Sequence, residues 1–343
     1  MSDATNDRKL EHIEIIRTDR DTDRRRHYFD DVRLIHRALP EIALDQIDTS
    51  CTFLGKRLSF PLLISCMTGG DHESMRVVNR NLAQAAEATG VAMGVGSQRV
   101  QFKRPEATAS FALREFAPTT VLLSNLGAVQ LNLGFGLEAC RTAVQTVGAD
   151  ALVLHLNPLQ EAVQPEGDTN FASLSTRIAD ISAGLEVPVI LKEVGAGMSP
   201  ADAEIALAAG VKILDVAGSG GTSWSRIEHH RDREGGTLGL LYQDWGIPTP
   251  LALRQLSPYR DRLTLIASGG IRSGLDMAKA VVLGASVCGL ASPFLQPALE
   301  SAESVVKLIH RLHREYRTAL FLLGAGSFEQ IHGQGHLLLE GTP

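Results

Sequence analysis

The chain has 343 residues, enough for one large domain or two ordinary ones with a sizeable hydrophobic core. Hydrophobic residues make up 44% of it and charged residues 21%, which excludes wholesale disorder. Its 33 basic and 39 acidic side chains give a formal net charge of −6, which argues against nucleic acid as the main partner. The opening segment is polar and no apolar run approaches ~18 residues, so we expect neither a signal peptide nor membrane insertion.

The chain contains four cysteines that are scattered and follow no metal-binding spacing. Because such cysteines stay reduced inside cells, we expect free thiols and a cytoplasmic location. Glycine is unusually common, with 32 residues. Since glycine lets the backbone approach other groups closely, this composition predicts loops that contact a ligand.

Eight short apolar runs recur along the chain, each followed by a glycine or polar turn and then by a stretch with helical periodicity. Runs that are apolar at every residue suit parallel strands buried on both faces. Eight such units over ~230 residues predict an α/β fold of the (β/α)8 TIM-barrel type. A doubly wound open sheet is the alternative, but no phosphate fingerprint follows the first strand. The expected strands are residues 61–66, 91–96, 119–125, 150–156, 187–192, 212–217, 263–268 and 286–291, and the clearest helical stretches are 79–90, 137–148, 200–210 and 275–284.

These units divide the chain into three parts. Residues 1–60 are predicted to form an N-terminal extension that packs on or over the barrel, residues 61–295 the barrel, and residues 296–343 a C-terminal helix and tail. The helix is expected from about 296 to 323, with an apolar stripe that packs on the barrel. The members of that stripe are Val305, Ile309, Leu312 and Leu320.

Two further segments differ from the repeat. The loop over residues 218–250, after the sixth strand, is far longer than its neighbours and is expected to border the active site. The segment RTDRDTDRRR at 17–26 is expected to be a solvated surface feature, because its charges largely balance one another.

Residues just past the carboxyl ends of barrel strands face the active site. Here those positions are polar, rich in glycine and chemically varied, which packing alone does not explain. The seventh strand runs into SGGIRSG at 268–274 and the eighth into GLASP at 289–293, where barrels commonly bind a phosphate on backbone N–H groups. A tight left-handed turn is the alternative for the glycines, but their place in the strand order favours phosphate.

Lys192 ends a buried apolar run. An ion pair with a nearby carboxylate such as Glu193 is the ordinary interpretation for a lysine at a strand end. Beside a candidate phosphate site, however, a flavin ring is the better hypothesis, because its N1–C2=O edge gains negative charge on reduction.

The exit of the fourth strand, HLNPLQE at 155–161, places His155, Asn157, Gln160 and Glu161 close together. Oxygen donors with a carboxylate suit Mg²⁺ shared with a substrate phosphate. For His155 alone, a buried hydrogen-bonded histidine is the better interpretation. Strand counting does not position three further basic residues of the extension, Arg8, Lys9 and His12, whereas Arg99 and Arg226 are candidates for phosphate contacts.

Taken together, the motifs resemble type 2 isopentenyl diphosphate isomerase, an FMN-dependent family. The resemblance runs from residue 8 to about 294, and its most specific parts are RKLEH at 8–12, HLNPLQE, and KEVGAGMS at 192–199. The other matching segments are HYFDDVRLIHRALPE at 27–41, MTGG at 67–70, GSQR at 96–99, SNLGA at 124–128, GGTSW at 220–224, WGIPT at 245–249 and SGGIRSG.

The resemblance implies a (β/α)8 homo-oligomer, tetrameric or octameric, that interconverts isopentenyl and dimethylallyl diphosphate with FMN, Mg²⁺ and NADPH as the reductant. Glu161 would bind Mg²⁺, and Gln160 and His155 would be catalytic beside the flavin. The substrate would be held by Arg8, Lys9, Ser97, Arg99, His155, Asn157 and Gln160. FMN would be held by Cys66, Met67, Thr68, Ser97, Asn125, Lys192, Thr222, Gly270, Ile271, Arg272, Ala291 and Ser292. Cys66 departs from the Ser or Ala usual there, so a hydroxyl contact is not expected.

Moving a double bond leaves the oxidation state unchanged, so a flavin in this reaction is expected to act as an acid and base. Three alternatives differ in the residues they need. A 2-hydroxy acid oxidase would need a histidine late in the barrel that the strand-seven region lacks, and an IMP-dehydrogenase-like barrel would need a cysteine within 218–250. A non-enzymatic FMN-binding protein would need neither HLNPLQE nor the basic pair of the extension.

Overall fold

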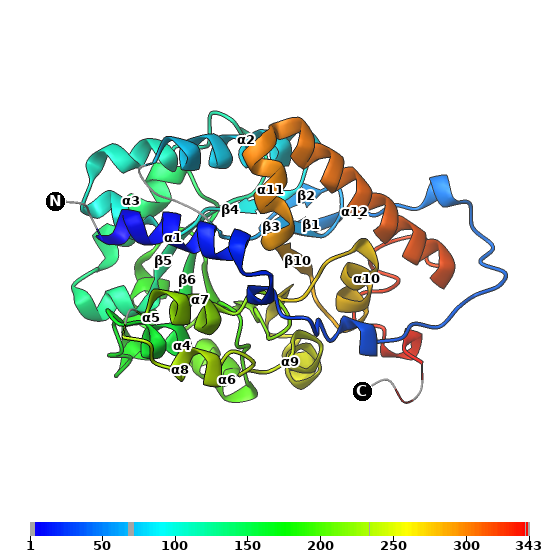
Figure 1. Cartoon of the computed structure of the whole chain (residues 1–343). Helices are drawn as coiled ribbons and strands as arrows, with labels where there is room; N and C mark the ends of the chain where they lie inside the picture. The colour runs from blue at the N-terminus through cyan, green and yellow to red at the C-terminus, as the bar shows by residue number, and fades with distance from the viewer. Residues whose placement is uncertain (1–3, 68–71, 233, 340, 342–343) are drawn as a thin grey trace.

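A computed structural model of the chain contains a closed barrel of eight parallel strands (Figure 1). The barrel closes where the last strand pairs with the first, with Leu62 opposite Cys288. Each strand overlaps one of the eight predicted runs, so the predicted (β/α)8 fold is confirmed. The strands are β3 (Leu62–Ile64), β4 (Ala92–Gly94), β5 (Leu122–Gly127), β6 (Ala151–Leu156), β7 (Val189–Glu193), β8 (Ile213–Asp215), β9 (Thr264–Ser268) and β10 (Val287–Leu290).

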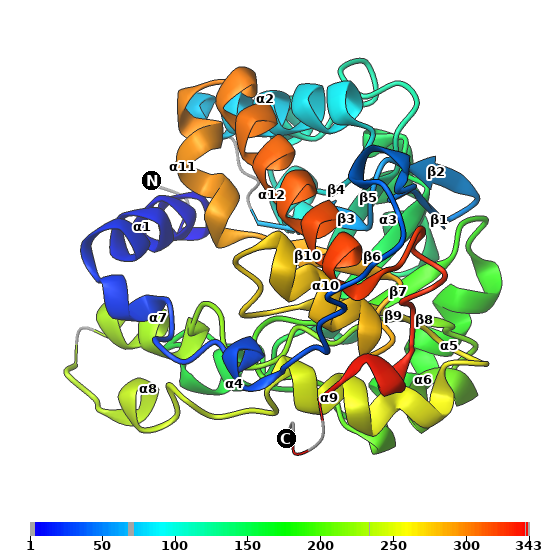
Figure 2. The same ribbon diagram turned by 90° about the vertical axis from the view of Figure 1, so that its right-hand side faces the viewer.

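The structure describes residues 4–67, 72–232, 234–339 and 341, with only the backbone for residues 4–10. Within these ranges every helix is too short or too polar to cross a membrane. Helices surround the barrel (Figure 2). Those that follow the barrel strands β3 to β9 are α2 (Glu73–Thr89), α3 (Leu137–Val147), α4 (Pro158–Val163), α5 (Leu174–Gly184), α6 (Pro200–Ala208), α7 (Trp224–Arg231), α8 (Leu238–Leu241), α9 (Thr249–Leu256) and α10 (Gly274–Val282). Short 3-10 helices are η1 (Arg20–Thr22), η2 (Phe29–Asp31), η3 (Leu44–Gln46), η4 (Gln98–Phe102), η5 (Pro105–Ser110), η6 (Ala128–Leu133), η7 (Ser257–Tyr259) and η8 (Gly335–Leu337).

The four predicted helical stretches fall on α2, α3, α6 and α10. Gly90 and Gly148 end α2 and α3 in the left-handed conformation, with φ of 66° and 64°. A side chain is strained in this conformation, which is why glycine there marks a helix end from sequence alone.

The N-terminal extension contains regular structure that the sequence pattern did not indicate. It begins with α1 (Ala4–Thr18) and later forms an antiparallel hairpin of β1 (Cys51–Phe53) and β2 (Lys56–Leu58) directly before β3. Phe53, Leu58 and Phe60 are buried there. Figure 2 shows the hairpin on the side of the barrel away from α1. The extension therefore contributes to both ends of the barrel.

The C-terminal helix expected from about 296 to 323 is instead two helices, α11 (Ser292–Glu300) and α12 (Ala302–Leu323). The chain breaks at Ser301, which is extended and whose side chain accepts a hydrogen bond from the Ser304 amide. This N-cap restarts the helix. The predicted stripe is buried along α12, which packs against α2, α10 and α11.

Gly274, the first residue of α10, marks a very close contact between α10 and α12. A Cβ atom there would overlap the Leu312 carbonyl oxygen and the Tyr316 amide nitrogen. We expect Gly274→Ala to lower the free energy of unfolding by about 1–3 kcal/mol, because the two helices must move apart. Urea denaturation measures this change.

The matched control is Gly136→Ala, because nothing lies within 4 Å of a Cβ at residue 136 and its φ of −108° suits alanine. Its free energy of unfolding should change by less than about 1 kcal/mol. Equal stability of the two variants would contradict the close packing of α10 on α12.

Candidate active site

A cavity of about 270 Å³ opens at the carboxyl ends of the barrel strands. Every strand, or the segment directly after it, contributes to the lining, through Ser65, Gly96, Asn125, His155, Lys192, Ala217, Ser268 and Gly289. The parallel barrel therefore brings together residues that are distant in sequence.

Most of the residues predicted for the site line this one cavity. They are Cys66, Met67, Ser97, Arg99, Asn125, His155, Asn157, Gln160, Glu161, Lys192, Thr222, Gly270, Ile271, Arg272, Ala291 and Ser292. Thr68 lies outside the described residues. Arg8 and Lys9 lie on α1, for which the structure gives only the backbone at these positions.

The floor of the cavity holds a buried ion pair. Lys192 Nζ lies 2.7 Å from Asp215 Oδ2 and 3.2 Å from Ser268 Oγ. The ordinary interpretation from sequence, an ion pair of Lys192 with a carboxylate, is therefore confirmed, but the partner is Asp215 and not Glu193. Neighbouring residues of a strand point to opposite faces, so Glu193 cannot follow Lys192 into the barrel.

Glu193 instead stabilises the loop after β7. Its Oε2 accepts hydrogen bonds from four consecutive backbone N–H groups, those of residues 194–197. Burial raises the pKa of Glu193 to about 7, and these hydrogen bonds oppose the rise. The carboxyl group thus fixes a loop whose residues Val194 and Gly195 line the cavity.

His155 and Asn125 meet on the adjacent strands β6 and β5. His155 Nδ1 lies 2.8 Å from Asn125 Oδ1, while Asn125 Nδ2 donates to the Val95 carbonyl oxygen at 3.1 Å. Because the amide nitrogen is committed to a carbonyl, Oδ1 is the acceptor and His155 Nδ1 carries the hydrogen. In the neutral ring Nε2 is then the acceptor atom.

Glu161 lies on α4 with both carboxylate oxygens hydrogen-bonded. Oε1 accepts from Asn157 Nδ2 at 2.8 Å, and Oε2 accepts from Gln164 Nε2 and from the Asp168 amide. Asn157 Oδ1 and Gln164 Oε1 are buried oxygens without a hydrogen-bond partner among the described residues. One carboxylate with two unpaired amide oxygens fits Mg²⁺. This ion binds few protein oxygens and fills its remaining coordination positions with water and phosphate.

No cluster of three or more His, Cys, Asp or Glu side chains suited to a metal exists in the described part of the chain. Any Mg²⁺ at Glu161 would therefore depend on a bound ligand for its remaining oxygens. Arg99 lies at the same rim and pairs with Asp168 at 2.9 Å. A phosphate that contacts Arg99 would share the guanidinium group of Arg99 with the carboxylate of Asp168.

Glu228 of α7 is absent from the predicted site residues, yet it links three elements. Its Oε1 lies 3.1 Å from His12 Nε2 and 2.7 Å from Gln160 Nε2, and its Oε2 lies 2.6 Å from Arg231 Nη1. Burial alone would raise the pKa of Glu228, but these partners outweigh it and lower the pKa to about 2. Glu228 follows Trp224 by one helical turn, a signal that could have indicated its position.

The N-terminal strap, which we define as residues 17–26, docks on the loops around the cavity. The prediction that it is a solvated surface feature is confirmed for Arg25, which is exposed and pairs with Asp21, but it is wrong for Asp19 and Arg24. Arg24 is only 6% exposed and donates to the carbonyl oxygens of Gly195, Thr222 and Gln243. The strap therefore anchors α1, whose residues His12, Ile13 and Ile16 line the cavity.

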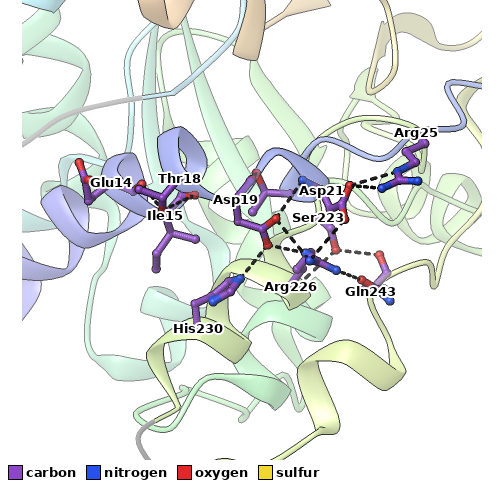
Figure 3. A network of polar contacts seen from close by, with 11 residues as sticks. Glu14, Ile15, Thr18, Asp19, Asp21, Arg25, Ser223, Arg226, His230 and Gln243 are labelled. Carbon is purple, nitrogen blue, oxygen red and sulfur yellow. Dashed lines mark hydrogen bonds and ion pairs between the residues drawn. The ribbon is translucent and has the colours of Figure 1, made fainter.

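Asp19 is the second anchor of the strap. It lies 2.6 Å from Arg226 Nε and 2.7 Å from His230 Nε2, both on α7 (Figure 3). The hydrogen bond from Arg226 lowers the pKa of Asp19 to about 2. Arg226 also donates to Gln243 and is not part of the cavity lining, so its expected phosphate contact is not supported and its role is to hold the strap.

The loops after β8 and β9 approach each other too closely for side chains. A Cβ on Gly269 would overlap the Gly218 carbonyl, and one on Gly221 would lie 3.0 Å from the Gly270 amide nitrogen. Gly269 and Gly270 also have φ of 92° and 81°, so the left-handed turn considered from sequence is present. The backbone of Gly269 and Gly270 lines the cavity beside Arg272 and fits a phosphate, and the Lys192 ammonium on the floor fits the electron-rich edge of a flavin.

Comparison with known proteins identifies relatives along the whole chain. The FMN-dependent dehydrogenase family model matches residues 5–112 and 129–337. The isopentenyl-diphosphate delta-isomerase of Paracoccus zeaxanthinifaciens is 55% identical over 338 residues, which cover 97% of each chain. The protein of the same name from Hydrogenovibrio crunogenus is 51% identical over 327 residues, covering 94% of this chain and 95% of the relative.

Solved structures agree on the fold. A flavocytochrome b2 variant with benzoylformate has a TM-score of 0.69 at 19% identity, covering 97% of this chain and 80% of that chain. A mandelate oxidase variant with a monooxide FMN adduct has a TM-score of 0.62 at 19% identity, covering 97% of this chain and 92% of that chain. The chain therefore belongs to the FMN-dependent dehydrogenase family and, within it, to the isopentenyl-diphosphate delta-isomerases.

Proposed function

We propose that this enzyme interconverts isopentenyl diphosphate and dimethylallyl diphosphate with reduced FMN and Mg²⁺. The observation that carries the proposal is 55% identity, over 97% of both chains, to a relative named for this reaction. The cavity supports it, because one opening combines a glycine-lined phosphate cradle, a buried cation, oxygen donors for Mg²⁺ and an apolar wall.

FMN would lie over the barrel floor, with its phosphate on the loops after β9 and β10 and its ring against Lys192. When bound, it supplies an aromatic group that can gain and lose protons in its reduced form. The chain would hold it through residues of several strands, and Asn125 is kept in place by its bond to His155. The set is Cys66, Met67, Thr68, Ser97, Asn125, Lys192, Thr222, Gly270, Ile271, Arg272, Ala291 and Ser292.

The substrate diphosphate would be shared between Mg²⁺ and cationic side chains. Glu161 with the oxygens of Asn157 and Gln164 would hold the metal. Arg99 would contact the diphosphate, and Arg8 and Lys9 would reach it from α1. Their backbone supports this role, because α1 continues from the cavity-lining residues His12, Ile13 and Ile16 toward the N-terminus.

The hydrocarbon part of the substrate needs an apolar, water-poor space. Ile13, Ile16, Met75, Trp224 and Leu295 provide apolar cavity lining. Exclusion of water matters because a double-bond shift builds positive charge on carbon, which water would trap. The strap that holds α1 over the cavity therefore serves the chemistry directly.

His155 and Gln160 would act beside the reacting carbons. His155 is oriented by Asn125, so that Nε2 is its acceptor atom. Gln160 is fixed at both ends, because Nε2 donates to Glu228 at 2.7 Å and Oε1 accepts from Asn157 at 3.2 Å. An amide does not titrate in water, so Gln160 would position the substrate and not carry a proton by itself.

We further propose NADPH as the reductant, a cytoplasmic location and a homo-oligomer, a tetramer or octamer. Four cysteines without a disulfide among them support a reducing compartment. Exposed apolar side chains on and after α8, among them Leu241 and Trp245, support contact with another copy of the chain.

Anaerobic incubation with isopentenyl diphosphate, FMN, Mg²⁺ and NADPH tests the proposal. We expect dimethylallyl diphosphate to accumulate to equilibrium, and we expect no consumption of lactate or mandelate under aerobic conditions. Product analysis by mass spectrometry and NMR measures both. Oxidation of a 2-hydroxy acid without any isomerisation would contradict the proposal.

Glu161→Gln should remove most of the Mg²⁺-dependent activity while FMN content stays unchanged. The loss should be at least ~10-fold, because even partners behind a metal ligand cost 10–100-fold. A Mg²⁺ titration of initial rates measures it. The control is Glu186→Gln, a carboxylate that pairs with Arg141 on the surface. Equal rates for wild type and Glu161→Gln at every Mg²⁺ concentration would refute the metal assignment.

Lys192→Met should lower the midpoint potential of bound FMN. The variant removes a cation from the edge where reduction adds negative charge and leaves Asp215 without its partner. A tenfold loss in the equilibrium for reduction corresponds to about 30 mV for a two-electron couple. Spectroelectrochemical titration measures the potential. An unchanged or higher value would mean that Lys192 does not lie beside the ring.

A further inference from the structure

The ion pair on the cavity floor is built into the barrel. Lys192 on β7 and Asp215 on β8 are register partners, so their side chains enter the barrel interior in one layer. Ser268 of β9 completes the cluster by donating to Asp215 Oδ1 at 2.6 Å, while Lys192 donates to Asp215 Oδ2 and to Ser268. Each of the three residues is less than a tenth exposed.

Stability does not explain this cluster. Taking two opposite charges out of water costs about as much as their attraction returns, and apolar residues of similar volume often stabilise a core more. Leu191 and Leu214, the neighbours in sequence, are buried on the opposite face of the strands, while the register partner of Lys192 on β6 is His155 of the cavity lining. The strands are already held by backbone pairing, so a charged pair at this position points to a role in the cavity.

The two charges have different access to the cavity. Lys192 lines it, whereas Asp215 is absent from the lining. A lysine has three N–H donors, and in the described structure Asp215 and Ser268 accept from two of them. The third N–H remains for a ligand. Asp215 therefore acts on the ligand through Lys192 and through its own charge behind that ammonium.

We propose that Asp215 is a positioning residue that fixes the Lys192 ammonium at the cavity floor and offsets part of its charge toward bound FMN. The inference rests on the proposed function, because the basicity of the reduced flavin matters only if the flavin exchanges protons with the substrate. A lone ammonium would stabilise negative charge on the reduced ring so strongly that the ring becomes a weak base. A carboxylate at 2.7 Å from the ammonium keeps the ring basic enough to exchange protons.

Asp215→Asn tests the proposal, because it keeps the size and a hydrogen-bond acceptor but removes the charge. The midpoint potential of bound FMN should rise, with at least a tenfold gain in the equilibrium for reduction, equivalent to about 30 mV for two electrons. Lys192→Met moves it the opposite way. Ser268→Ala keeps both charges and should shift the potential less than Asp215→Asn does.

Asp150→Asn is the matched control, since Asp150 also pairs with cations, Lys56 and Arg114, but lies at the other end of β6. It should leave the potential unchanged. A potential for Asp215→Asn that is unchanged or lower, with FMN bound normally, would overturn the proposal, as would an equal rise in Asp150→Asn.

If Asp215→Asn does not fold, the double variant Lys192→Met/Asp215→Asn replaces it, because it leaves no buried charge unpaired. Its potential should lie above that of Lys192→Met alone, and equal potentials would overturn the proposal. These titrations contain no substrate. A failure to isomerise isopentenyl diphosphate would therefore refute the proposed function without affecting them, whereas unchanged potentials would refute the role of Asp215 alone.

Discussion

Closure of eight parallel strands into a barrel is the constraint on which the rest of the molecule depends. Parallel pairing places all carboxyl ends at one rim, and register then decides which side chains share a layer. The pairing of Lys192 with Asp215 and of Gly127 with His155 follows from that register. Residues from every barrel strand thus meet in one cavity, although helices and loops separate consecutive barrel strands in the sequence.

The barrel alone leaves the cavity open, and the N-terminal strap completes it. Arg24 donates hydrogen bonds to carbonyl oxygens of the loops after β7 and β8, and Asp19 forms an ion pair with Arg226 of α7. Asp23 pairs with Arg272 beside the glycines of the loop after β9. Buried polar groups need such partners, so the strap is held by many specific contacts. Those contacts keep α1, and the apolar lining that it carries, over the cavity.

The strands and the rim residues were predictable because their signal is local. An apolar run followed by a glycine turn specifies a buried strand wherever it occurs, and strand order then assigns the rim. Partners across the fold were not predictable. The strap looks solvated in sequence because its opposite charges could pair with one another, and Glu228 belongs to the site only because α7 meets α1 and α4. Lys192 has a carboxylate as its neighbour in sequence, yet the alternation of strand side chains gives it Asp215 instead.

In the proposed function, a barrel of the FMN-dependent dehydrogenase family carries out a reaction without net oxidation or reduction. The most direct test of this function is a count of turnovers per reduced flavin in anaerobic solution, after all excess reductant has been removed. We expect many molecules of dimethylallyl diphosphate per flavin while the absorbance of the reduced flavin stays constant. One reoxidised flavin for each molecule of product would contradict it.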